Sequence, residues 1–186
     1  MERFCRGSFG SFSCIFHIIP ALPSYFTLVT HRLTFHLTDE AATLAFGATI
    51  AAILHPGLII FLNGNLGAGK TTLVRGILRG LGYQGKVKSP TYNLIELYKI
   101  SRLYLYHFDF YRFSDPREWE EAGFREYFNA DSICLVEWPE KVGGLLPPPD
   151  LRFVLEIAEA GRYIEVQAVT EAGRLCLKRW QALKSL

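Results

Sequence analysis

The sequence predicts an α/β fold in a single domain, with a central mixed β-sheet flanked by helices. Its 186 residues suit one domain with a substantial core, and 49% apolar with 20% charged residues is typical of folded proteins. Two short apolar runs, 58–62 and 133–136, have the length and continuity of buried parallel strands. Segments with helical spacing of apolar residues lie on both sides of the first run, so helices and strands alternate.

The first 28 residues differ in composition from the rest. They contain a single acidic residue, Glu2, and Pro20 and Pro23 interrupt their apolar positions. A signal peptide needs an unbroken apolar centre and a membrane helix needs about twenty apolar residues, and this stretch supplies neither. We interpret residues 1–28 as a disordered extension or a mis-assigned start, and residues 29–186 as the folded domain. We therefore expect a cytoplasmic protein with no membrane partner.

Charge and cysteine spacing exclude other classes. The formal net charge of +2 falls short of the strongly basic surface of a domain that binds nucleic acid by itself, so contact with RNA would need a partner. Cys5, Cys14, Cys134 and Cys176 form no CxxC pair and lack the spacing of zinc ligands. We expect reduced thiols, with Cys134 a buried apolar residue of its strand.

The first helix is predicted over residues 39–54. It has an N-cap candidate at its start, acidic residues in the first turn and apolar residues at helical spacing, and His55-Pro56-Gly57 ends it. The strand 58–62 follows, and a second helix over 71–79 is ended by Gly80 and Gly82.

The second half of the sequence predicts the remaining strands and two helices. Residues 92–100 and 103–110 are rich in aromatic and branched residues and form an expected antiparallel pair. A short helix starts at Asp115-Pro116-Arg117-Glu118, where Asp115 is the N-cap and Glu118 reaches back. The later expected elements are the strand 132–137, the strands 151–158 and 163–169 joined by a turn at 159–162, and a final helix containing Leu175 to Leu183. The letters of 159–162 recur at 171–174, which we interpret as a second turn.

One motif carries specific chemistry. Gly64-Asn65-Leu66-Gly67-Ala68-Gly69-Lys70-Thr71 matches G-x-x-x-x-G-K-[ST] between the predicted strand and helix. The glycines let backbone N–H groups approach phosphates, Lys70 reaches the β and γ oxygens, and the Thr71 hydroxyl ligates Mg²⁺. Thr72 caps the helix or touches the α-phosphate. A glycine-rich turn without a ligand would leave Lys70 and Thr71 without a packing purpose, so we predict a nucleotide site.

Hydrolysis needs further groups: a carboxylate that orders the metal and a residue that positions water. Glu137 ends an apolar strand, as a Walker B acid does, and Asp109 ends another strand. Ser89-Pro90-Thr91-Tyr92 resembles a switch segment whose hydroxyl groups could join the metal or the γ-phosphate, although a proline turn before a strand explains these residues equally well. Arg75 and Arg112 are candidate charge-stabilising residues.

Four motifs in this order resemble the TsaE family, also called YjeE, of bacterial tRNA threonylcarbamoyladenosine biosynthesis ATPases. They are the P-loop with Thr72, Ser89-Pro90-Thr91-Tyr92-Asn93-Leu94, His107-Phe108-Asp109-Phe110-Tyr111-Arg112 and Val136-Glu137-Trp138-Pro139. The resemblance extends from about Thr30 to the C-terminus. It implies a P-loop fold, ATP and Mg²⁺ as cofactors, and weak ATPase activity in isolation. It also implies action with the TsaB and TsaD proteins, and contact with tRNA only indirectly, through that complex.

The same resemblance implies roles for individual residues. Lys70 and the loop bind phosphates, Thr71 and Glu137 hold Mg²⁺, and Thr91 and Asp109 belong to the hydrolytic site. Trp138 is implied to lie beside the nucleotide, and the stretch from Thr38 to Glu40 near the adenine. Asn65 stands where many relatives carry aspartate, which removes no essential group.

Two other functions remain open on the residues alone. A small-molecule kinase would share the P-loop and use Asp109 as the base toward an acceptor hydroxyl, but the sequence offers no evident arginine-bearing lid. A nucleotide-dependent binding switch would use ATP to order residues 89–92, with incidental hydrolysis.

Overall fold

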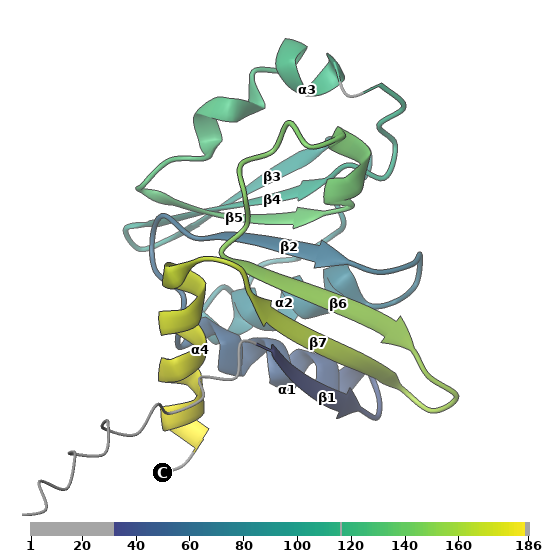
Figure 1. Ribbon diagram of the computed structural model, residues 1–186, viewed down its shortest axis with the longest axis vertical. Coiled ribbons are helices and arrows are strands. Elements are labelled where there is room, and N and C mark those ends of the chain that lie inside the picture. The colour runs from purple at the N-terminus through teal and green to yellow at the C-terminus, as the bar shows by residue number, and fades with distance from the viewer. Residues whose placement is uncertain (1–31, 116, 185–186) are drawn as a thin grey trace, which may run out of the picture.

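The computed structural model describes residues 32–115 and 117–184 (Figure 1). The predictions for residues 1–28 and for Pro116 therefore lie outside the described residues. In chain order the elements are β1 (Arg32–Leu37), α1 (Glu40–Ala51), β2 (Ile59–Asn63), α2 (Lys70–Gly80), β3 (Ile95–Ile100), β4 (Leu103–Asp109), α3 (Arg117–Glu121), β5 (Ser132–Glu137), β6 (Leu151–Ile157), β7 (Arg162–Ala168) and α4 (Glu171–Lys184). Two short 3₁₀ helices, Phe124–Tyr127 and Pro139–Val142, flank β5.

One mixed sheet of seven strands forms the centre of the molecule, in the order β1-β7-β6-β2-β5-β4-β3 (Figure 1). β6, β2, β5 and β4 are parallel to their neighbours within this group, and β7, β1 and β3 extend the two sides by antiparallel pairing. The predicted α/β class with a mixed sheet is confirmed. Because β2 and β5 lie in the interior of the sheet, both of their faces must be covered, which explains their continuous apolar runs.

Each face of the sheet carries its own hydrophobic cluster. Residues of α1, α2 and α4 pack with inward-facing residues of β2, β5, β6 and β7 in one cluster. The other cluster contains Phe61, Phe108, Trp119, Phe124 and Val136, and so joins the opposite face to α3 and the first 3₁₀ helix. β5 alternates between the two, with Leu135 in the first and Val136 in the second, as the period of a strand requires.

Helices α1 and α2 approach each other closely through glycines. A Cβ atom on Gly47 would lie 2.6 Å from the carbonyl oxygen of Leu73, and one on Gly76 would meet the carbonyl oxygen of Leu44. This contact fixes the position of α2, whose first turn carries the P-loop lysine.

Replacing Gly47 with alanine is therefore expected to destabilise the protein, although alanine favours a helix by about 1 kcal/mol over glycine. Forcing apart two packed helices costs about 2 kcal/mol, which lowers Tm by about 4–8 °C in a chain of this size. Differential scanning calorimetry measures the change. Ala45→Ser, on the exposed side of α1, is the control and should stay within about 0.5 kcal/mol. A Tm that rises with Gly47→Ala would contradict the tight helix contact.

Three local features differ from or refine the sequence predictions. β1 was not predicted, although Arg32 to Leu37 alternates polar and apolar residues as an edge strand does. Residues 171–174 were predicted as a turn, and this prediction is wrong: they form the first turn of α4, where the Thr170 hydroxyl accepts a hydrogen bond from the Gly173 N–H at 3.2 Å. The predicted start of the short helix is confirmed, because the Glu118 carboxylate accepts the Asp115 N–H at 3.0 Å.

Cys134 is buried in β5, as predicted, and burial raises the pKa of its thiol to about 12. Since the thiolate is the reactive form, we expect no alkylation of Cys134 by iodoacetamide at pH 8 in the folded protein, and full alkylation in guanidinium chloride. Peptide mass mapping checks each cysteine separately. Rapid labelling of Cys134 in the native protein would contradict the burial of β5.

In the described part of the chain, no helix combines the length and the apolar composition needed to cross a bilayer.

Candidate functional site

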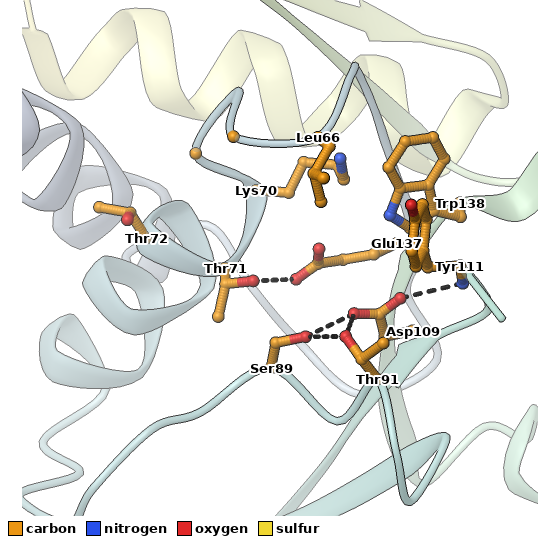
Figure 2. Close-up of a pocket in the computed structure, with 12 residues that line it drawn as sticks. Leu66, Lys70, Thr71, Thr72, Ser89, Thr91, Asp109, Tyr111, Glu137 and Trp138 are labelled. Atoms are coloured by element: carbon orange, nitrogen blue, oxygen red, sulfur yellow. Dashed lines mark hydrogen bonds between the residues drawn. The ribbon is translucent and has the colours of Figure 1, made fainter.

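Most of the predicted site residues meet at one edge of the sheet. The P-loop follows β2, Asp109 ends β4 and Glu137 ends β5, and the register places Glu137 opposite both Leu62 and Asp109. Because these strands are parallel, their carboxyl ends lie together at the edge where α/β sheets bind ligands. A pocket of about 410 Å³ opens there (Figure 2). Its lining residues are Leu66, Gly67, Gly69, Lys70, Thr71, Thr72, Ser89, Thr91, Asp109, Tyr111, Glu137 and Trp138.

The P-loop turns on glycines with left-handed backbone angles. Gly67 has φ 80° and Gly69 has φ 102°, values that side-chain-bearing residues rarely adopt. The turn places Lys70 at the start of α2, where its Nζ donates hydrogen bonds to the carbonyl oxygens of Gly64 at 2.6 Å and Asn65 at 3.0 Å. The ammonium group is thus held by weak, neutral acceptors inside the pocket.

Lys70 is only 4% exposed. Burial lowers the pKa of its ammonium group from the usual value, and the carboxylates of Glu137, Asp109 and Glu140 oppose this shift. Its Nζ also lies 4.0 Å from the centre of the Trp138 ring (Figure 2). A buried cation with neutral hydrogen-bond partners binds an anion favourably, because the anion replaces hydration that burial removed.

Thr71 and Glu137 are in direct contact. The Thr71 hydroxyl donates to Oε1 of Glu137 at 2.8 Å, and the Glu137 side chain is almost fully buried (Figure 2). Hydroxyl and carboxylate oxygens are the ligands that Mg²⁺ prefers. Two neighbouring ligands of an octahedral Mg²⁺ with bonds of 2.0–2.1 Å lie about 2.9 Å apart, so the spacing of this pair fits the ion.

Asp109 forms hydrogen bonds with two residues of the predicted switch segment. Its Oδ2 accepts hydrogen bonds from the hydroxyl groups of Ser89 at 2.5 Å and Thr91 at 2.6 Å, and its Oδ1 accepts the Tyr111 N–H at 3.0 Å (Figure 2). Asp109 is 2% exposed, so these donors are its main solvation. Three donors therefore hold this buried carboxyl group in one orientation. These hydrogen bonds are compatible with both interpretations of residues 89–92, the switch segment and the proline turn before a strand.

Trp138 has an unusual backbone. Its φ of 57° is in the left-handed region, which is rare for a bulky residue. This conformation turns the chain sharply after β5 and brings the indole to the pocket, where it packs against Tyr111 with ring centres 5.0 Å apart. Strained residues of this kind concentrate at ligand sites.

Some predicted residues lie away from the pocket. Thr38 and Glu40 do not line it, and the Glu40 carboxylate accepts a hydrogen bond from Nη1 of Arg75 at 3.1 Å. Arg112 stacks over the ring of Tyr92 at 4.3 Å on the surface. The two arginines considered for charge stabilisation are thus engaged outside the pocket lining.

The structure adds residues that the sequence did not assign. Arg162, at the start of β7, donates from Nη1 to the Ala68 carbonyl at 2.7 Å and so supports the P-loop from 94 residues away. His107 contacts Glu137 through Nε2 at 2.9 Å. His107 belongs to a recognised motif, but only the pairing of β4 with β5 shows what it touches. No local signal indicated Arg162.

Comparison with known proteins identifies the family of the chain. The family model described as threonylcarbamoyl adenosine biosynthesis protein TsaE matches residues 37–164. The chain is 49% identical over 147 residues to the tRNA threonylcarbamoyladenosine biosynthesis protein TsaE of Haemophilus influenzae, covering 76% of this chain and 93% of that one. It is 39% identical over 127 residues to the same-named protein of Bacillus subtilis, covering 68% and 79%.

A solved structure has the same fold. The crystal structure of Bacillus subtilis YdiB superimposes with a TM-score of 0.71 at 30% identity, covering 82% of this chain and 96% of that one. All four motifs that suggested the resemblance lie within the matched residues 37–164. The chain belongs to the TsaE family of threonylcarbamoyl adenosine biosynthesis proteins.

Proposed function

We propose that this protein is a Mg²⁺-dependent ATPase that supports tRNA N6-threonylcarbamoyladenosine formation beside the anticodon, acting in the cytoplasm with the TsaB and TsaD proteins. The observation that carries the proposal is the contact of Thr71 with Glu137 beside the buried Lys70 at a complete P-loop. The names of the relatives supply the pathway. The small net charge of +2 favours tRNA contact through partner proteins.

Each site residue has a physical role in this proposal. Lys70 exchanges the carbonyl oxygens of Gly64 and Asn65 for phosphate oxygens, which are stronger acceptors. Thr71 and Glu137 hold Mg²⁺, which when bound neutralises charge on the β and γ phosphates. The indole of Trp138 closes one side of the pocket and excludes water.

Asp109 is the group placed to act on the attacking water. Its carboxylate lies in the pocket with Ser89 and Thr91, whose hydroxyl groups fix its orientation. In the proposed reaction Asp109 orients the water in line with the γ-phosphate and accepts its proton. In this proposal the hydroxyl groups of Ser89 and Thr91 exchange Asp109 for the γ-phosphate when ATP binds, which would make residues 89–92 responsive to ATP.

ATP turnover with and without purified TsaB and TsaD tests the proposal, together with mass spectrometry of modified tRNA and a screen for phosphorylated small molecules. We expect slow basal hydrolysis, an increase with both partners, and modified adenosine that depends on this protein. Turnover that ignores the partners and rises with a small hydroxyl compound would identify a kinase instead.

A further inference from the structure

His107 is a buried polar residue with a single polar contact among the described residues. Its side chain, on β4, is 0% exposed, and its Nε2 lies 2.9 Å from Oε1 of Glu137. Its Nδ1 is also buried, and no described residue forms a hydrogen bond with it. Leaving one ring nitrogen unpaired costs free energy, so the contact with Glu137 is the compensating interaction.

The contact determines where the ring carries its proton. Oε1 of Glu137 accepts the hydrogen bond of Thr71 and lies 2.9 Å from Nε2 of His107, so this oxygen acts as an acceptor and Nε2 of His107 as the donor. The ring therefore carries a hydrogen on Nε2, directed at Oε1 of Glu137.

The pairing of β4 with β5 explains why the hydrogen bond of His107 reaches Glu137. His107 pairs with Leu135 across the sheet, so its ring reaches diagonally along β5 to Glu137, whose own neighbour on β4 is Asp109. Oε1 of Glu137 thus receives donors from two elements: Thr71 on α2 and His107 on β4. Thr71 is itself placed to bind the metal, whereas His107 lies behind Glu137 and does not line the pocket.

We propose that His107 is a positioning residue that holds Glu137 toward the metal through Nε2–H, before and after nucleotide binds. The inference rests on the proposed function, because it concerns the same Mg²⁺ site. Partners that orient a metal ligand in this way typically contribute 10- to 100-fold to metal affinity, so we expect a loss of that order without the imidazole.

The test compares His107→Leu, which keeps an apolar side chain of moderate size but no donor, with His107→Gln, whose amide N–H can take the place of Nε2–H. Binding of a fluorescent ADP analogue is titrated with Mg²⁺ and repeated in EDTA. For His107→Leu we expect the half-saturating Mg²⁺ concentration to rise about 10- to 100-fold, with little change of affinity in EDTA. His107→Gln should recover most of the difference. Equal Mg²⁺ dependence in wild type and His107→Leu, or equal impairment of both variants, would overturn the inference.

A second measurement does not need the leucine variant to fold. Nitrogen-15 NMR of the imidazole groups in the wild-type, metal-free protein should show a hydrogen on Nε2 of His107, whose signals are assigned by their absence from His107→Gln. An Nδ1–H tautomer would overturn the inference while leaving the proposed function intact. Wild-type protein whose ADP binding shows no dependence on Mg²⁺ would instead overturn the proposed metal site.

Discussion

Replacing Lys70 with methionine is expected to weaken ATP binding by about 100- to 20,000-fold and to abolish measurable turnover. The buried ammonium group would bind two phosphate oxygens, and hydrogen bonds to charged groups contribute about 1.5–3 kcal/mol each. Methionine retains the length of the side chain and its packing near Trp138 but removes the charge. Isothermal titration calorimetry measures the binding, and phosphate release measures the turnover.

Lys178→Met is the matched control, because Lys178 is exposed on α4, away from the pocket. It should leave binding and turnover unchanged and alter stability by no more than about 0.5 kcal/mol. If Lys70→Met binds ATP as tightly as wild type, the loop does not hold phosphates in the proposed way, and the nucleotide site must be sought elsewhere.

Asp109→Asn is expected to slow ATP hydrolysis about 100- to 10,000-fold, the usual contribution of a positioned general base. Nucleotide affinity should change little, because Lys70, Thr71 and Glu137 remain. Asparagine keeps the shape of the side chain and an acceptor for Ser89 or Thr91, but cannot accept the proton of water. Single-turnover hydrolysis at saturating ATP separates the chemical step from binding.

Asp131→Asn supplies the control, since Asp131 is an exposed acid just before β5.

The Asp109→Asn protein also separates hydrolysis from switching when it is added to TsaB, TsaD and tRNA. Loss of tRNA modification with intact ATP binding supports a required hydrolysis step. Full modification by the same protein would show that nucleotide binding suffices and would favour the switch. Unchanged hydrolysis would contradict the role given to Asp109.

Local sequence determined most of the elements that build the site. β2 and β5 lie between other strands, so both faces are buried and their apolar runs are unbroken, which makes them visible without a structure. The P-loop glycines need particular backbone angles, and Lys70 and Thr71 follow at fixed spacing. Because parallel strands end at one edge, the prediction that Glu137 and Asp109 share a site follows from their positions after strands.

Two elements could not be predicted correctly because their local sequence signals are weak: the first turn of α4 and the strand β1. The four letters Glu-Ala-Gly-Arg occur twice, as the turn that enters β7 and as the first turn of α4. Glycine is compatible with both structures, and the neighbouring Thr170 cap decides the second. β1 carried an alternating pattern, but six residues at the edge of a sheet gain their stability from pairing with β7, which the sequence does not specify.

The sequence by itself determined the fold class, the glycine-rich loop before α2 and the two acids at the strand ends, because each depends on short-range spacing. Only the tertiary structure decided which side chains support them. Arg162 reaches Ala68 across 94 residues, and His107 reaches Glu137 because β4 lies beside β5. It also placed Thr38 and Glu40 outside the pocket lining. Such contacts arise from strand order and register, which are set by the packing of the whole sheet.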